Sequence, residues 1–294
     1  MAGGAGLRVK GTDMGSTSTN GNANGELKRS DTAPRSSGGG GAASAADAQQ
    51  AKSRTKAKGE KKGGTGSTSD RSKAWMLLDR SGSMSGREVA VVHGVNGFLA
   101  EQSALPGKCK VTLVQFDSAD PFEILADAVS VNKACPLSVE QYRPRAATPL
   151  LDAIGSLIGR ADERAKRRRK AGKQPEDQTV VIVTDGLENA STDFSGADIH
   201  RLISSKREQG WAFVFMGANQ DSYFEGSKLG FDPRSVQNYE ASDEGVGEAF
   251  ASVSRAYSER RTMHATVGIT PDNDDFFGGV REAEEGMRRR SQGN

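Results

Sequence analysis

The sequence has no aromatic residue before Trp75, and the stretch up to Asp70 consists mainly of Gly, Ser, Ala, Thr and Lys. A segment of this composition cannot bury enough apolar surface to offset the entropy that it loses on ordering. We therefore expect residues 1–71 to be a disordered tail and residues 72–262 to form one folded domain. Residues 263–294 are expected to be a flexible C-terminal tail, with Phe276 and Phe277 outside the domain.

Long apolar runs and a rich supply of cysteine are also missing. No stretch of about 18 apolar residues occurs, and the first residues do not include the apolar segment of a signal peptide. The two cysteines, Cys109 and Cys135, are too few for a disulfide framework and fit free thiols in a reducing compartment. These absences favour a cytoplasmic protein without a membrane-bound part.

Charge is divided unevenly along the chain. The stretch up to Asp70 has 11 Lys or Arg against 6 Asp or Glu, a net +5, which leaves −3 for the rest of a chain whose total is +2. A basic tail suits an anionic partner, but no aromatic residues interleave its lysines for stacking on bases. The basic run ERAKRRRK at 163–170 falls at a predicted helix C-terminus, where cations meet the helix dipole favourably. We therefore do not expect nucleic-acid binding.

Apolar runs after residue 72 predict the strands. The runs KAWMLLD (73–79), TVVIVTDG (179–186) and WAFVFMGAN (211–219) have the near-continuous apolarity of buried strands. The runs KVTLVQFD (110–117) and FEILADAVSV (122–131) are separated by so short a connection that they must pair antiparallel.

Segments of helical period lie between the strands. The motifs SGRE (85–88) and SGAD (195–198) each predict a helix start, and Thr148 with Pro149 predicts a third, with the threonine as the cap. The apolar stripes are Val91, Val95, Phe98 and Leu99; Leu150, Ile154, Leu157 and Ile158; Ile199, Leu202 and Ile203; and Val246, Phe250, Val253 and Tyr257. This alternation predicts an α/β fold: a doubly wound, mainly parallel sheet with one antiparallel edge strand and helices on both faces.

Oxygen-bearing side chains follow two of the predicted central strands. In LLDRSGSM, Asp79, Ser81 and Ser83 alternate after the first strand. Asp185 is the acid of VIVTDG, and Thr148 precedes a helix. Ligands of parallel sheets bind at the carboxyl ends of the strands. Two carboxylates and three hydroxyls suit a small hard cation, Mg²⁺ first, with Mn²⁺ or Ca²⁺ as alternatives. Helix capping and an ordinary turn are the alternative, and they would be favoured for either loop alone; the two loops together favour metal binding.

The combination of LLDRSGSM, TPLLDAI and VIVTDG resembles the metal-ion-dependent adhesion site of von Willebrand factor type A domains, over about residues 72–262. It looks most like the intracellular bacterial members. The resemblance implies that Ser81, Ser83 and, in the binding-competent state, Thr148 contact the metal directly, with Asp79 and Asp185 direct or through water. It also implies that a protein partner supplies a Glu or Asp carboxylate to the open position. One departure is RAATP, where many members have glycines before the threonine.

The expected partner-binding rim is Asn219, Gln220 and Asp221, which follow the strand that should lie beside VIVTDG. The alternative function is a Mg²⁺-dependent phosphohydrolase. An aspartyl phosphotransferase needs an acid two residues after its first Asp, where this chain has Ser81, and no G-x-S-x-G elbow of a serine hydrolase occurs. We therefore expect a metal-dependent protein-binding module without catalytic residues.

Overall fold

The computed structural model describes residues 71–218, 222–266, 273 and 275–279, all within one compact unit, Glu60–Asn294. They contain a six-stranded sheet with the strand order β3-β2-β1-β4-β5-β6. The strands are β1 (Arg71–Asp79), β2 (Lys108–Asp117), β3 (Asp120–Ser130), β4 (Asp177–Thr184), β5 (Ala212–Ala218) and β6 (Val236–Tyr239). β2 and β3 pair antiparallel, and every other neighbouring pair is parallel. The predicted mainly parallel sheet with one antiparallel edge strand is confirmed.

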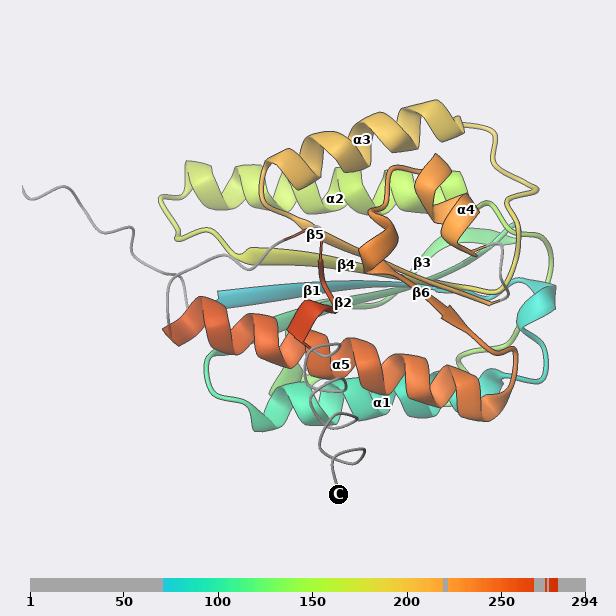
Figure 1. Ribbon diagram of the computed structural model, residues 1–294, viewed down its shortest axis with the longest axis horizontal. Helices are drawn as coiled ribbons and strands as arrows, with labels where there is room; N and C mark the ends of the chain where they lie inside the picture. Colours follow the sequence, from blue (N-terminus) through green and yellow to red (C-terminus); the bar gives the residue numbers. More distant parts are fainter. Residues whose placement is uncertain (1–70, 219–221, 267–272, 274, 280–294) are drawn as a thin grey trace, which may run out of the picture. The chain divides into compact units, whose positions relative to one another are not determined.

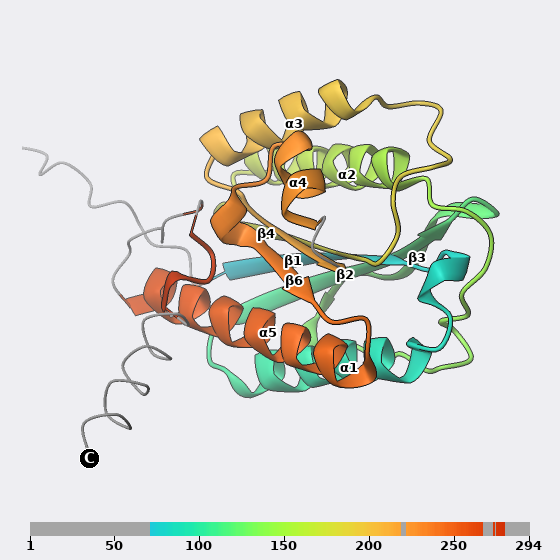
Figure 2. The same ribbon diagram turned by 45° about the vertical axis from the view of Figure 1, so that its right-hand side comes forward.

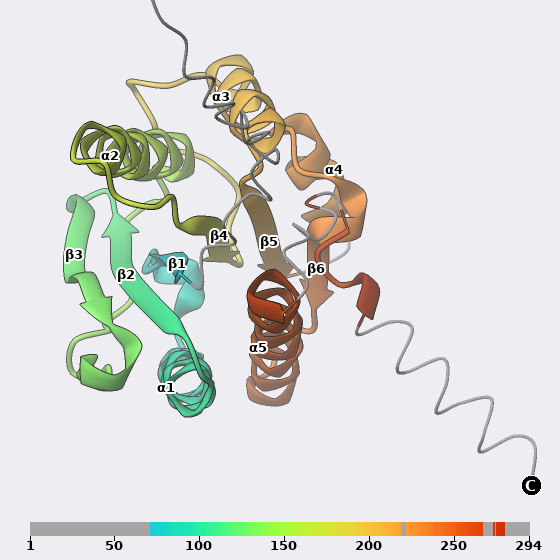
Figure 3. The same ribbon diagram turned by 90° about the vertical axis from the view of Figure 1, so that its left-hand side faces the viewer.

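Helices cover both faces of this sheet (Figures 1 and 3). On one face lie α1 (Glu88–Ala104) and α5 (Asp243–Thr266); on the other lie α2 (Leu150–Lys170), α3 (Gly196–Glu208) and the short α4 (Ser222–Lys228). The doubly wound α/β class is therefore confirmed. No helix in the described ranges combines the length and the apolarity needed to cross a bilayer.

Side chains of the central strands alternate between the two helical layers. In β1, Met76 and Leu78 belong to the apolar cluster under α1 and α5, whereas Trp75 and Leu77 belong to the cluster under α2 and α3. Since both faces of a parallel strand are buried, the near-continuous apolar runs have a direct structural cause.

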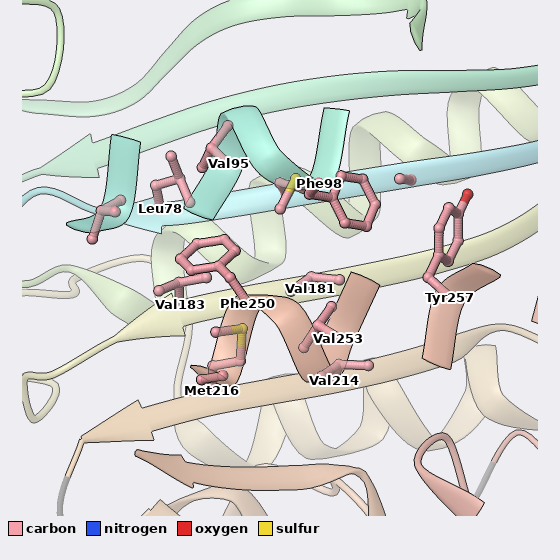
Figure 4. Close-up of a cluster of buried hydrophobic side chains, with 14 of the residues drawn as sticks. Leu78, Val95, Phe98, Val181, Val183, Val214, Met216, Phe250, Val253 and Tyr257 are labelled. Carbon is pink, nitrogen blue, oxygen red and sulfur yellow. The ribbon is translucent and has the colours of Figure 1, made fainter. Parts of the chain in front are cut away.

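The α1 and α5 helices meet through aromatic side chains. Figure 4 shows Phe98 of α1 between Phe250 and Tyr257 of α5, in front of the strands; the Phe98 and Tyr257 ring centroids are 5.4 Å apart. A Cβ on Gly94 would lie 2.3 Å from the Phe250 ring, so only glycine permits this close approach. The predicted apolar stripes of these two helices are all buried.

The chain reverses its direction of winding between β1 and β4, which are neighbours at the centre of the sheet. The loops that follow these two strands leave from the same end of the sheet, on the right in Figure 1 and turned forward in Figure 2. This arrangement is the crevice at which ligands of open α/β sheets bind.

Two predicted helix starts are wrong. Ser85 does not cap α1, which begins at Glu88, because the preceding residues form the 3₁₀ turn Gly82–Met84 and the Glu88 carboxylate instead accepts the Gly86 N–H. Thr148 does not cap α2, which begins at Leu150 with Pro149 at the cap position. The start at Ser195 is confirmed, with a reciprocal capping box between Ser195 and Asp198.

The C-terminal phenylalanines also differ from expectation. Phe276 and Phe277 are 6% and 5% exposed and belong to the apolar cluster under α1 and α5, so they do not lie outside the domain. Apolar burial of two adjacent rings explains why this segment packs against the domain despite its acidic neighbours. The expected tail ends at residue 71, but Arg71 is already the first residue of β1. Residues 1–70 lie outside the described residues, and their disorder remains a prediction.

Candidate metal centre

The structure brings the five predicted ligand side chains together at the carboxyl end of β1 and β4. Ser83 Oγ donates a hydrogen bond of 2.7 Å to Oδ1 of Asp185, and the Ser81 and Ser83 Oγ atoms are 3.0 Å apart. Asp79, Ser81 and Thr148 are 0%, 1% and 2% exposed, whereas Ser83 is exposed. The buried residues thus form a floor, and the site opens to solvent on the side of Ser83.

Asp79 is buried at the end of β1, and each of its carboxylate oxygens has a donor. The Ser81 N–H donates to Oδ1 at 2.7 Å, and the Thr184 hydroxyl donates to Oδ2 at 2.6 Å. Tyr142, itself fully buried, donates its hydroxyl hydrogen to the Asp79 main-chain carbonyl. Burial raises the pKa of Asp79 to about 6, with a smaller contribution from the Asp185 charge, against the lowering effect of the hydrogen bonds.

Gly186 marks the point toward which three of the oxygens converge. A Cβ built on Gly186 would lie 3.1 Å from both Ser83 Oγ and Thr148 Oγ1, and 3.5 Å from Asp79 Oδ2. A side chain at position 186 would therefore crowd these oxygens, and glycine lets the hydroxyl and carboxylate groups approach one another. Such a set of hard oxygen donors is the chemistry that Mg²⁺ or Mn²⁺ requires.

The spacing of the oxygens also fits a small octahedral ion. Neighbouring ligands of an ion bound at 2.0–2.1 Å are about 2.9 Å apart. The Ser81–Ser83 and Ser83–Asp185 oxygen distances, 3.0 and 2.7 Å, are close to that value. Both distances are also ordinary hydrogen-bond lengths, so it is the donor chemistry that fits Mg²⁺ or Mn²⁺. The residues that would hold the ion are Asp79, Ser81, Ser83, Thr148 and Asp185.

A cation from α1's N-terminal region already faces the site. The Arg87 guanidinium donates to Oδ2 of Asp185 and, at 2.7 Å, to the main-chain carbonyl of Ser83. Arg87 thus orders both the serine loop and the β4 loop. With Asp79 and Asp185 ionised, the three side chains sum to a charge of −1.

The loops that contain Thr148 and Asp185 are bonded to each other. The Asn189 side chain accepts the Thr148 N–H at 2.8 Å, and the Glu188 carboxylate accepts the Leu151 N–H at 2.9 Å. In return, the Asp152 carboxylate accepts N–H groups of the β4–α3 loop. The first turn of α2 is therefore capped by the β4–α3 loop, which explains why Thr148 is free to face the metal site rather than cap the helix.

Several of these contacts were not predicted from the sequence. Thr184 and Gly186 lie inside the TDG motif and could have been included on that ground, whereas Tyr142 and Arg87 show only as a lone aromatic residue and a charged residue in polar loops. The predicted rim, Asn219, Gln220 and Asp221, lies outside the described residues. Within the described ranges, no three His, Cys, Asp or Glu residues form a metal-binding group, so any metal here depends on the hydroxyls.

No family model matches the chain, and a search of curated proteins found no relative. Among solved structures, the SpaC pilus adhesin of Lactobacillus rhamnosus GG matches with a TM-score of 0.50 and 12% identity, over 64% of this chain and 30% of the adhesin. A von Willebrand factor type A structure from Catenulispora acidiphila has a TM-score of 0.47 and 16% identity, over 65% and 42% of the two chains. Manganese-loaded TRAP protein of Plasmodium vivax has a TM-score of 0.41 and 16% identity, over 62% and 71%.

This chain therefore spans less than half the length of the first two structures that it matches. The likeness to SpaC shows the fold alone, at an identity of 12%. That fold, with its antiparallel edge strand and two helical layers, is the one that the sequence motifs implied. The described part of the chain therefore has the same kind of doubly wound α/β fold as the matched part of the adhesin.

Proposed function

We propose that this domain is a protein-binding module that holds a divalent metal ion, Mg²⁺ first and Mn²⁺ as an alternative, and captures a partner carboxylate on it. The observation that carries the proposal is the approach of Ser83, Thr148 and Asp79 oxygens to Gly186, at 3.1–3.5 Å from a Cβ built there. An ordinary helix cap or turn would not require hydroxyl and carboxylate groups from two separate segments, the end of β1 with its loop and the loop before α2, to face the same glycine.

Charge supports the capture of an anionic group. Asp79, Asp185 and Arg87 together give −1, so a bound divalent cation leaves the site at +1. A site with residual positive charge attracts one more anionic oxygen, and a bound metal is the largest local charge in such a site. When bound, the metal supplies this attraction and an open coordination position; the residues of the chain hold its other positions.

Metal binding can be tested with a substitution that crowds the candidate ligands but removes none of them. Gly186→Ala places a methyl group between the Ser83 and Thr148 oxygens, and the backbone of Gly186 is not in the left-handed region that would resist alanine. Gly159→Ala is the matched control, because a Cβ there meets nothing within 4 Å. In calorimetric titrations, we expect Mg²⁺ or Mn²⁺ binding by the parent and by Gly159→Ala, and none by Gly186→Ala or Asp79→Ala. Unchanged metal affinity in Gly186→Ala would refute the proposed centre.

The partner is to be identified by retention on the immobilised protein with Mg²⁺ present and release by EDTA. Loss of retention in the Asp79→Ala variant would assign the capture to this site. We also propose that the setting is cytoplasmic and bacterial; the support is the sequence resemblance alone.

The alternative, a Mg²⁺-dependent phosphohydrolase, lacks an acid for the leaving group. The position two residues after Asp79 is Ser81, 1% exposed and placed against Ser83. The three histidines are on α1, α3 and α5 rather than in the site loops. We therefore propose that the protein is not an enzyme. Turnover of generic phosphoesters with Mg²⁺, abolished by Asp79→Ala, would overturn this conclusion.

A further inference from the structure

A hollow of about 140 Å³ opens directly beside the candidate metal centre. Asp185 and Gly186 belong to both places, since they line the hollow and are also part of the candidate metal centre. The rest of the hollow is mainly apolar, with Leu187 from the β4 loop and Phe215, Gly217 and Ala218 from β5. The metal centre and the hollow are therefore neighbours that share Asp185 and Gly186.

The size and the lining of the hollow suit one apolar side chain. An apolar cavity of about 150 Å³ accommodates benzene, so a leucine, isoleucine or phenylalanine side chain is of the right size. Leu187 is 61% exposed, so most of its side chain does not pack against the described domain and is available to a partner. The exposed aromatic residues Tyr223 and Phe224 directly follow Ser222, another residue that lines the hollow.

None of the described residues that line the hollow is a basic partner for a second acidic side chain. Glu225 and Asp185 are the charged residues that line it, and each already has a basic partner, Lys228 at 2.9 Å and Arg87. Within the described residues, no Lys or Arg lines the hollow. A partner carboxylate would lose water there without gaining a basic partner, whereas an apolar side chain would gain contact area without that penalty.

We propose that the partner segment is bipartite: an Asp or Glu that reaches the metal, and a leucine-sized apolar side chain within two residues of it that enters this hollow. The proposal rests on the proposed metal-dependent function. Consecutive residues of an extended chain are about 3.3–3.6 Å apart, so a segment of two or three residues is long enough to reach between two places that share Gly186. The metal would then bind the acidic side chain, and Leu187 and Phe215 would contact the apolar side chain next to it.

The test uses short blocked peptides and the full chain with Mg²⁺. The peptides contain Asp and Leu in a glycine background, with Leu one or two positions before or after Asp; matched sets replace Leu with Ala, or Asp with Asn. Binding is followed by amide chemical shifts of the labelled protein. We expect the best Asp–Leu peptide to bind about 10-fold more tightly than its Asp–Ala counterpart, and EDTA or the Asn replacement to abolish binding.

The variant Leu187→Ser distinguishes the contribution of the hollow to peptide binding from that of the metal. It should remove the preference for Leu while leaving the affinities for Mg²⁺ and for the Asp–Ala peptide unchanged. Met263→Ser, an exposed apolar residue of α5, is the matched control and should keep the preference. If the Asp–Ala peptides bind with Mg²⁺ and Leu adds nothing at any spacing, the hollow proposal fails and the metal-dependent capture stands. If no peptide needs Mg²⁺, the proposed function fails, and the bipartite segment with it.

Discussion

The Arg87 guanidinium lies 2.5 Å from Oδ2 of Asp185, while Oδ1 of the same carboxylate accepts the hydroxyl hydrogen of Ser83. One candidate metal ligand is therefore shared between a fixed cation and a hydroxyl that is itself a candidate ligand. Arg87 competes electrostatically with a metal ion and, for the same reason, adds to the attraction of the loaded site for an anion.

Arg87→Gln should separate these two effects. Removing the guanidinium should tighten Mn²⁺ binding by about 5-fold or more, since a unit charge at contact range costs about 1 kcal/mol even in water. The same variant should weaken capture of an Asp-containing peptide. Calorimetry with Mn²⁺ and peptide titration of the loaded protein measure the two effects. Arg87→Lys keeps the charge and should stay near the parent in both; weaker Mn²⁺ binding by Arg87→Gln would mean that Arg87 mainly positions Asp185.

Asp79→Asn should lose metal binding yet not destabilise the metal-free protein. Burial disfavours the charged form of Asp79, and Asp185 adds a like charge nearby. In EDTA at neutral pH, the variant should unfold at the same urea concentration as the parent or at a higher one. With metal at ten times its dissociation constant, only the parent should gain about 1.4 kcal/mol.

Phe98→Ala shows how much stability the protein loses when a buried core side chain is truncated. Phe98 is 1% exposed, and its truncation should cost about 3–5 kcal/mol with or without metal. A loss of that size for Asp79→Asn in EDTA would show that Asp79 mainly orders the serine loop through the Ser81 N–H.

Ala146, two residues before Thr148, has a φ of 60° in the left-handed region, where glycine is favoured. Its carbonyl accepts the Gly82 N–H at 3.0 Å, so this conformation joins the Thr148 segment to the serine loop. Ala146→Gly should therefore raise the free energy of unfolding, by up to about 1 kcal/mol.

The matched variant Ala147→Gly has no positive φ to relieve and should lower that free energy by about 0.4–1 kcal/mol. Urea unfolding of both variants measures the difference. Equal losses in the two would show that the backbone at Ala146 is not strained.

Elements with a clear period could be predicted from the sequence, and short ones could not. The runs that form β1, β4 and β5 are apolar because both faces are buried, and the stripes on α1 and α5 follow from one buried face each. By contrast, α4 has seven residues and β6 has four, too few for a period to show. The antiparallel pair was predictable because a short connection permits only one direction.

For the candidate site, residues within one sequence motif could be predicted, whereas contacts between residues far apart in the sequence could not. Asp79, Ser81 and Ser83 occur in one motif, and the rule that ligands bind at strand ends points to Asp185. The bond between Arg87 and Asp185 joins residues 98 positions apart, and that from Tyr142 to Asp79 joins residues 63 apart. Such contacts depend on how two loops meet, which periodicity does not encode. The false capping box at Ser85 has the same cause, because the serine loop forms a turn at the site instead of a helix start.

Lys73 is fully buried at the start of β1, a costly place for a charge. Its Nζ donates to the Thr112 hydroxyl at 2.5 Å and lies 4.1 Å from the Trp75 ring centroid. Burial first, and then the Arg164 charge, lower the pKa of Lys73 well below its usual value, against weaker opposing effects of Glu176 and Asp127.

The pH dependence of stability follows from that shift. Between the lowered folded pKa and the ordinary value near 10.5, the unfolded chain binds a proton at Lys73 that the folded chain does not. The contribution of Lys73 to the free energy of unfolding should therefore rise with pH in this window, by up to about 1.4 kcal/mol per pH unit. Lys73→Met keeps the shape of the side chain and removes the proton. It should be more stable than the parent at pH 7, with an advantage that shrinks toward pH 10 in urea unfolding. Lys133→Met, at an exposed position, controls for the lost positive charge; an advantage of Lys73→Met that did not change with pH would show that Lys73 keeps its proton in the folded protein.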